Sequence, residues 1–165
     1  MNPTRLILLS AALLLAMGCG KKDTLTSTTS EGDKVKVTTK GDKSRLEITS
    51  KSGEKTVLNV GAGGVELPAG FPKDLPLFPK HAVQASHQNG QDIIVHVVAQ
   101  APWTEVAKYY ETELKSQGWD IEQNTTMGEG AMISTAKGKV KCMLMFAKAD
   151  DKSTNVQFML SPKDE

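Results

Sequence analysis

Cysteine is the most reactive side chain in this sequence, because its thiolate can act both as a nucleophile and as a metal ligand. Cys142 lies in the run 139–148, whose alternating side chains predict a strand. The face that carries it also carries apolar residues, namely Val140, Leu144 and Phe146. We therefore expect Cys142 to be a buried small hydrophobic residue, with a pairing or redox role as the alternative. No His can be placed beside it as a base, so no catalytic residue is predicted.

Methionine and histidine side chains define a second candidate surface, on the opposite face of this strand. Met143 and Met145 belong to the strand, Met159 to the next one, and His96 to a strand predicted over 92–100. Thioethers and imidazole suit Cu(I), so a soft-metal site is one alternative. Its candidate ligands are these four residues together with Met127 and Met132. The other alternative is a contact face for a partner or ligand, with the same four residues as its candidates. No metal or cofactor is predicted.

Signatures of the common enzyme classes do not occur in the sequence. There is no Gly-x-Ser-x-Gly, no His-Glu-x-x-His and no Gly-rich phosphate loop that opens a helix. Asp150 and Asp151 are adjacent carboxylates, but Lys152 beside them is typical of a solvated turn. We expect a protein that is not an enzyme. The alternative is a hydrolase whose site is assembled from distant residues.

The first residues have the layout of an export signal. Arg5 is the only charged residue within 1–18, and an uncharged stretch of 12 residues runs from Leu6 to Met17. A helix that crosses a bilayer needs roughly 20 apolar residues. This stretch is therefore too short for a permanent transmembrane anchor.

The segment Leu15-Ala16-Met17-Gly18-Cys19 resembles the lipobox of bacterial lipoproteins. The resemblance implies cleavage between Gly18 and Cys19 and lipidation of the Cys19 sulfur. Two or three acyl chains hold a domain on a membrane, where one chain would not. Gly20 after the cysteine favours the outer membrane, facing the periplasm, over the inner membrane. The alternative is a secretory signal that is cut elsewhere, with Cys19 incidental.

The charge balance limits the partners. The 165 residues include 20 basic and 19 acidic side chains, for a formal net charge of +1. Affinity for nucleic acid comes largely from clustered Lys and Arg that replace counterions. We therefore expect no nucleic acid as a partner. The expected partners are the membrane, through the anchor at Cys19, and an envelope protein.

Composition divides the chain into consecutive parts. After the signal peptide at 1–18, the polar stretch 19–32 predicts a lipidated cysteine and a flexible tether. Three short alternating runs within 33–60 predict a β meander, with a flexible stalk of β propensity as the alternative. The Gly/Pro-rich stretch 61–81 predicts an extended connector, and 82–165 predicts an α+β domain.

The α+β domain is predicted from periodicity and turn signals. Asn89-Gly90 marks a hairpin, and a helical stripe of apolar residues runs between Pro102 and Gly118. Pro102 suits the first helical position, and Gly118 suits the residue just past the helix end. Four further strands follow, which predicts an antiparallel sheet with one helix packed on one face. The other face is also apolar, and one helix cannot cover both faces. We expect the meander or a partner protein to cover it.

A second resemblance rests on the segments 71–79, Phe-Pro-Lys-Asp-Leu-Pro-Leu-Phe-Pro, and 109–119, Tyr-Tyr-Glu-Thr-Glu-Leu-Lys-Ser-Gln-Gly-Trp. They are similar to a group of small bacterial envelope proteins, and the similarity implies no activity. The sequence as a whole predicts a lipid-anchored envelope protein that is a non-catalytic binding or assembly module. The alternatives are a periplasmic carrier or sensor of a small apolar ligand or soft metal, and a hydrolase.

Overall fold

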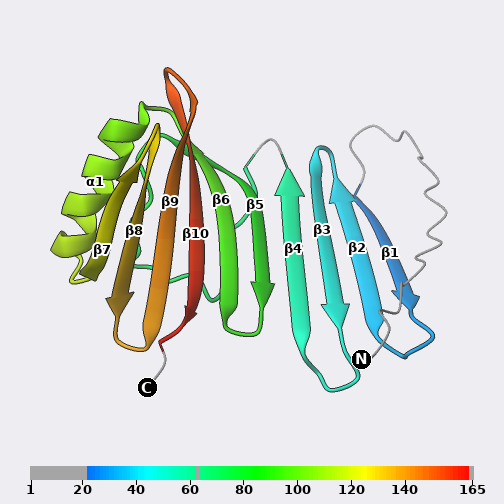
Figure 1. Ribbon diagram of the computed structural model, residues 1–165. Coiled ribbons are helices and arrows are strands. Elements are labelled where there is room, and N and C mark those ends of the chain that lie inside the picture. Colours follow the sequence, from blue (N-terminus) through cyan, green and yellow to red (C-terminus); the bar gives the residue numbers. More distant parts are fainter. Residues whose placement is uncertain (1–21, 62–63, 164–165) are drawn as a thin grey trace, which may run out of the picture.

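All the strands described belong to one antiparallel sheet. The computed structural model describes residues 22–61 and 64–163, with ten strands in the order β1-β2-β3-β4-β5-β6-β10-β9-β8-β7 (Figure 1). The first four strands are β1 (Lys22–Thr28), β2 (Lys34–Lys40), β3 (Lys43–Thr49) and β4 (Lys55–Gly61). The others are β5 (His81–Asn89), β6 (Asp92–Ala99), β7 (Asp120–Met127), β8 (Gly130–Lys137), β9 (Val140–Asp150) and β10 (Ser153–Pro162). The helix α1 (Trp103–Ser116) packs on one face, over β7 to β10.

The second half of the chain confirms the predicted α+β arrangement of two strands, a helix and four strands. The apolar stripe of α1 faces the sheet, where Val106, Tyr110 and Leu114 are buried. Pro102, predicted at the first helical position, lies just before the helix with an extended ψ of 146°. Its carbonyl accepts hydrogen bonds from the first turn, so the helix begins one residue later than predicted.

Gly118 ends α1 as predicted. Its φ of +75° lies in the left-handed region, which residues with a Cβ adopt at a cost. The amide of Gly118 donates to the Lys115 carbonyl, and the amide of Trp119 donates to the Leu114 carbonyl. These two bonds form a Schellman motif, which satisfies helix-terminal carbonyls and turns the chain into β7.

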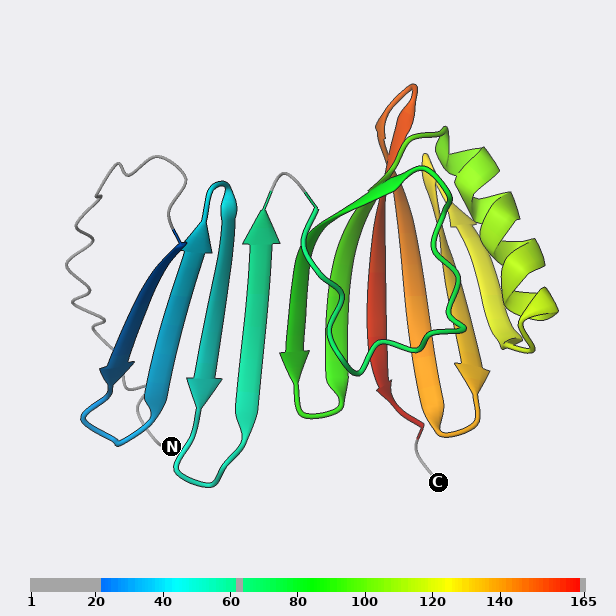
Figure 2. The same ribbon diagram turned by 180° about the vertical axis from the view of Figure 1, so that it is seen from behind.

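Residues 64–80, between β4 and β5, contain no helix or strand and cross the same face as α1 (Figure 2). We call this segment the strap. It makes two successive tight turns, in which Phe71 and Leu75 donate their amides to the carbonyls of Pro68 and Pro72. Phe71, Leu75 and Phe78 are buried in the core, a role that the prediction did not give them.

The core lies between the sheet on one side and α1 with the strap on the other. Aromatic rings join the three layers: Phe71 and Tyr110 each pack edge-to-face on Phe158 of β10, at centroid distances of 5.6 and 5.8 Å. Tyr110 also accepts a hydrogen bond from the Phe78 amide, at 3.1 Å, and so fastens the strap to the helix. Burial of large aromatic rings contributes most of the stabilising free energy of such a core.

Residues 22–61 extend the sheet sideways. The tether predicted over 19–32 is wrong for Lys22–Thr28, which form the edge strand β1, and β2 to β4 are the three predicted meander strands. Strand β4 pairs with β5, and Asn59 Nδ2 donates to Ser86 Oγ across this junction. The meander therefore joins the α+β domain edge to edge and does not cover its second face, contrary to the expectation from the sequence.

The signal peptide at 1–18, the cleavage site at Gly18 and Cys19, and the first residues of the predicted tether lie outside the described residues. Lipidation of Cys19 therefore stays a prediction. Within the described ranges, no helix is both long and apolar enough to span a membrane.

The strap should contribute to stability as core residues do. Leu75 is 3% exposed, so Leu75→Ala leaves a cavity under the strap and should lower the free energy of unfolding by about 2–4 kcal/mol. Leu67→Ala, at a strap residue that is 36% exposed, is the matched control and should cost well under half as much. Urea unfolding followed by circular dichroism measures both. Equal small effects would show that the strap does not close the core.

Candidate ligand-binding site

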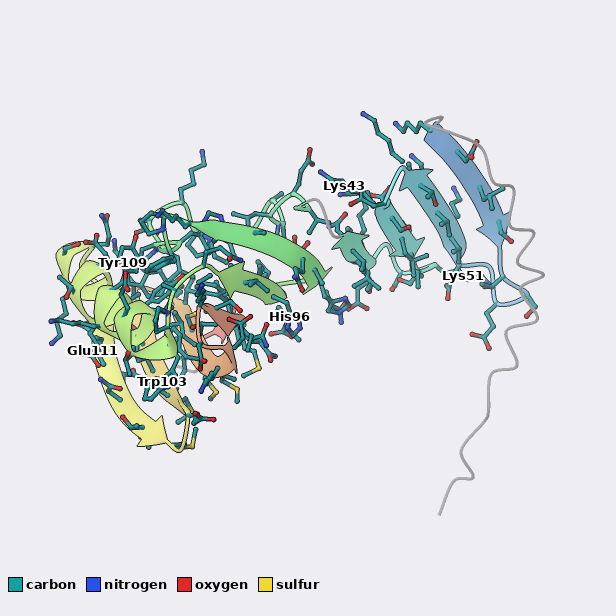
Figure 3. The ribbon with its side chains drawn as sticks, turned by 90° about the horizontal axis from the view of Figure 1, so that it is seen from above. Lys43, Lys51, His96, Trp103, Tyr109 and Glu111 are labelled. Atoms are coloured by element: carbon teal, nitrogen blue, oxygen red, sulfur yellow. The ribbon has the colours of Figure 1, made fainter. Side chains whose placement is uncertain are left out.

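The two faces of the sheet differ in what covers them. On β6, Val95 and Val97 are buried under α1 and the strap, whereas His96 and Val98 alternate with them and point to the other side. We call the side that carries His96 the open face, because no helix or strap residue among those described lies over it. Figure 3 shows His96 on the opposite side of the sheet from Tyr109 of α1.

The strand register brings the four predicted residues together on the open face. Gln157 of β10 pairs with His96 on one side and with Met145 on the other. In the next row, Met159 pairs with Met143. The sequence prediction that these side chains share a surface therefore agrees with the pairing of β6, β10 and β9.

A hollow of about 380 Å³ lies on the open face, where the sheet bends between the meander and the β9–β10 hairpin (Figure 3). Its lining comes from five neighbouring strands and includes His96 and Met145; Met143 and Met159 lie outside it. The remaining side chains that point into it from the open face include Val60, Gln84, Ala85, Val98, Ala147, Asn155 and Gln157.

The lining combines apolar surface with unused polar groups. Val60, Val98 and Met145 supply the apolar part. Gln84, His96 and Gln157 have no side-chain hydrogen-bond partner within the described ranges. A small number of polar groups set in apolar surface is typical of ligand pockets, where they orient the ligand.

The metal alternative has weaker support. Among the described residues, no three His, Cys, Asp or Glu side chains are placed to hold a metal ion. A soft cation on the open face would have one imidazole, that of His96, and the thioethers of the methionines. Most ligands of such a metal ion would therefore be thioethers.

Cys142 has the buried position predicted for it. It is 0% exposed, on the face under α1, and desolvation raises the pKa of its thiol to about 12. At neutral pH the sulfur is therefore protonated and out of contact with solvent, which removes its nucleophilic character.

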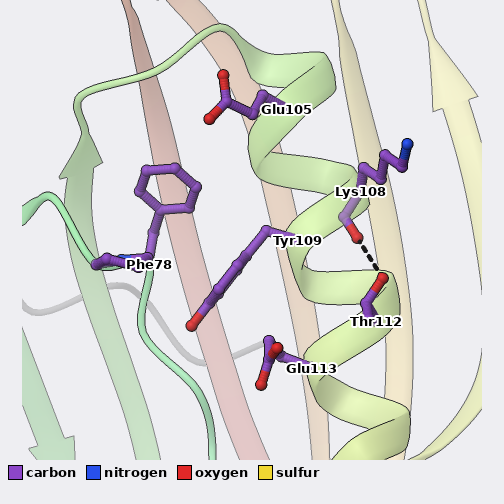
Figure 4. A pocket seen from close by; sticks show the side chains of 7 residues that line it. Phe78, Glu105, Lys108, Tyr109, Thr112 and Glu113 are labelled. Atoms are coloured by element: carbon purple, nitrogen blue, oxygen red, sulfur yellow. Dashed lines mark hydrogen bonds between the residues drawn. The ribbon is translucent and has the colours of Figure 1, made fainter.

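A second hollow, of about 400 Å³, lies between the strap and α1 (Figure 4). Phe78 and Tyr109 form its apolar wall, with ring centroids 5.1 Å apart, and Glu105, Lys108 and Glu113 form its rim. Tyr109 donates to the Leu77 carbonyl, and desolvation, with Glu113 nearby, raises the pKa of its hydroxyl. Sequence reasoning missed this groove, because nothing in the local pattern says that the strap lies beside the helix.

The comparisons with known proteins match only the second half of the chain. A family model described as START domain-like matches residues 81–157, just under half of the chain, from β5 through the first half of β10. No curated protein and no solved structure matches the chain. The antiparallel sheet with its single described helix is consistent with this α+β fold. The meander and the strap lie outside the matched residues.

Burial of Cys142 predicts its reactivity. With Cys19→Ser, Cys142 is the only thiol of the mature chain. Its pKa near 12 implies that labelling by Ellman's reagent at pH 8 is at least about 100-fold slower than for glutathione and becomes fast in urea. Labelling of the folded protein at the rate of the small thiol would contradict the burial and reopen a redox role.

Proposed function

We propose that this chain is a non-catalytic ligand-binding module of the cell envelope, and that an apolar ligand binds in the hollow on the open face. The observation that carries the proposal is the joint presence, in one hollow, of apolar surface and of polar side chains without partners. The START domain-like match to residues 81–157 supports a ligand-binding role and favours the carrier alternative over a purely structural one.

The space between helix and sheet is a poorer place for the ligand. Phe71, Leu75 and Phe78 of the strap already fill it. Trp119 Nε1 donates to the Asp74 carbonyl, and Lys137 forms an ion pair with the Asp74 carboxylate. Displacing the strap would expose three buried apolar side chains, each contributing roughly 1.5–3 kcal/mol by burial. The open face needs no such rearrangement.

The cellular part of the proposal rests on the lipobox. Lipidation of Cys19 would hold the module on a membrane, with the outer membrane facing the periplasm favoured, and would leave the sheet in the aqueous compartment. In cells, Cys19→Ser should release the protein from the envelope fraction. Persistence of the variant in that fraction would argue for a different means of attachment.

A neutral apolar dye tests the site. N-phenyl-1-naphthylamine should bind the mature chain saturably, with increased fluorescence. Met145 is 39% exposed, so Met145→Glu should leave the fold intact yet weaken dye binding at least about tenfold, because the carboxylate must be desolvated in the hollow. Met127→Glu, at a residue that is 51% exposed and outside the hollow, is the matched control and should not change the affinity.

Two outcomes of the dye experiment would contradict the proposed site. Equal affinity of Met145→Glu and the unsubstituted chain would exclude the open-face hollow. Loss of binding in Tyr109→Ala, with Met145→Glu unaffected, would place the ligand in the groove between the strap and α1 instead.

A further inference from the structure

Three lysines without anionic partners lie side by side at one end of the meander. Lys22 of β1 pairs with Lys40 of β2, and Lys40 pairs with Lys43 of β3. Pairing in register places the three side chains on one face of the sheet, the face opposite His96. Figure 3 shows Lys43 on that side of the meander. We call Lys22, Lys40 and Lys43 the lysine row.

The lysine row is electrostatically unfavourable in the isolated protein. Like charges directly opposite each other destabilise a strand pair. The neighbouring cations differ, because Lys36, Arg45 and Lys55 all form ion pairs with Glu47. Hydrogen bonds from Arg45 and Lys55 lower the pKa of the Glu47 carboxyl. Among the described residues, no carboxylate forms an ion pair with any member of the row. The three ammonium groups of the row are therefore available to bind an external anion.

A hollow of about 320 Å³ accompanies the row. Its lining includes all three lysines together with Arg45, Thr38 and Glu66 of the strap. Arg45 is engaged with Glu47 and donates to Asn59 at 3.2 Å, so it supports the lining as a fixed charge. Ammonium groups around a shallow hollow fit a phosphate group as point charges.

The position of the row in the chain identifies the source of that phosphate. Cys19, the predicted lipid attachment site, precedes Lys22 by three residues. A fully extended chain spans at most about 3.6 Å per residue, so the Cα atoms of these two residues lie within about 11 Å of each other. A diacylated Cys19 would therefore hold the β1 end of the sheet at the headgroup layer.

We propose that the lysine row is a docking surface for the phosphate headgroups of an anionic phospholipid bilayer. The proposal rests on the proposed anchor at Cys19, and it gives the meander a role. With strands about 4.8 Å apart, the hollow between β4 and β9 lies roughly 14–34 Å from β1 along the sheet. The meander then acts as a rigid spacer, in place of the flexible tether predicted from the sequence.

Vesicle partitioning tests the lysine row separately from lipidation in cells. In the mature chain, residues 19–165, a single 14-carbon maleimide is attached to Cys19, and Cys142 is too buried to react. The vesicles are phosphatidylcholine alone, or phosphatidylcholine with about one third phosphatidylglycerol. Each lysine near an anionic surface contributes about 1 kcal/mol, so Lys22→Gln/Lys40→Gln/Lys43→Gln should lower partitioning onto the anionic vesicles by about 100-fold. Partitioning onto phosphatidylcholine should not change.

The matched control removes the same charge elsewhere. Lys73→Gln/Lys115→Gln/Lys152→Gln replaces three exposed lysines of the strap, α1 and the β9–β10 turn and should lower partitioning less than threefold. Urea unfolding should show the row variant to be at least as stable as the unsubstituted chain, because like-charge repulsion is removed.

Three outcomes would overturn the proposal. The two triple variants could lose equal affinity for the anionic vesicles, which would show that the net charge of the protein, and not the position of the lysines, determines binding. The row variant could retain its affinity for anionic vesicles. The row variant could lose as much affinity for phosphatidylcholine vesicles as for anionic vesicles, which would show that the lysines do not act on anionic headgroups. Release of Cys19→Ser from the envelope in cells tests the anchor, so the two proposals can fail independently.

Discussion

A β-sheet has two faces, and the described part of this chain covers only one of them. In the α+β domain, both faces carry apolar side chains, because β6, β10 and β9 alternate core residues with Ile94, Met159 and Met143. The helix and the strap both pack on the same side. The uncovered apolar surface, with His96 in it, is the surface that remains available to a ligand.

The strap explains why both covers lie on one side. A helix of 14 residues spans about 21 Å and covers the sheet mainly over β7 to β10. The strap covers the rest with Phe71, Leu75 and Phe78, and Tyr109 and Tyr110 bind its carbonyl and amide groups. The START domain-like match includes α1, strands β5 to β9 and half of β10, but it excludes the strap, so this chain closes its core with a segment outside the matched residues.

Periodicity and turn chemistry predicted the local elements, and they could not predict how distant elements meet. Alternation identified the strands of the second half, and Gly118 marked the helix end because its conformation favours glycine. Strand β1 was missed because Thr24, Thr26 and Thr28 alternate with only one large apolar residue, Leu25. The β4–β5 junction depends on backbone pairing and on Asn59 with Ser86, which no local pattern encodes. The alternation around Cys142 did predict the methionine face, since a buried face on one side fixes the residues on the other.

Methionine methyl resonances provide the most direct test of ligand binding on the open face. The mature chain has five methionines: 127, 132, 143, 145 and 159. With carbon-13 methyl labels and N-phenyl-1-naphthylamine as the probe, the account predicts the largest shift at Met145, smaller shifts at Met143 and Met159, and none at Met127. Unchanged methyl resonances, with shifts confined to the amides of α1 and the strap, would contradict it.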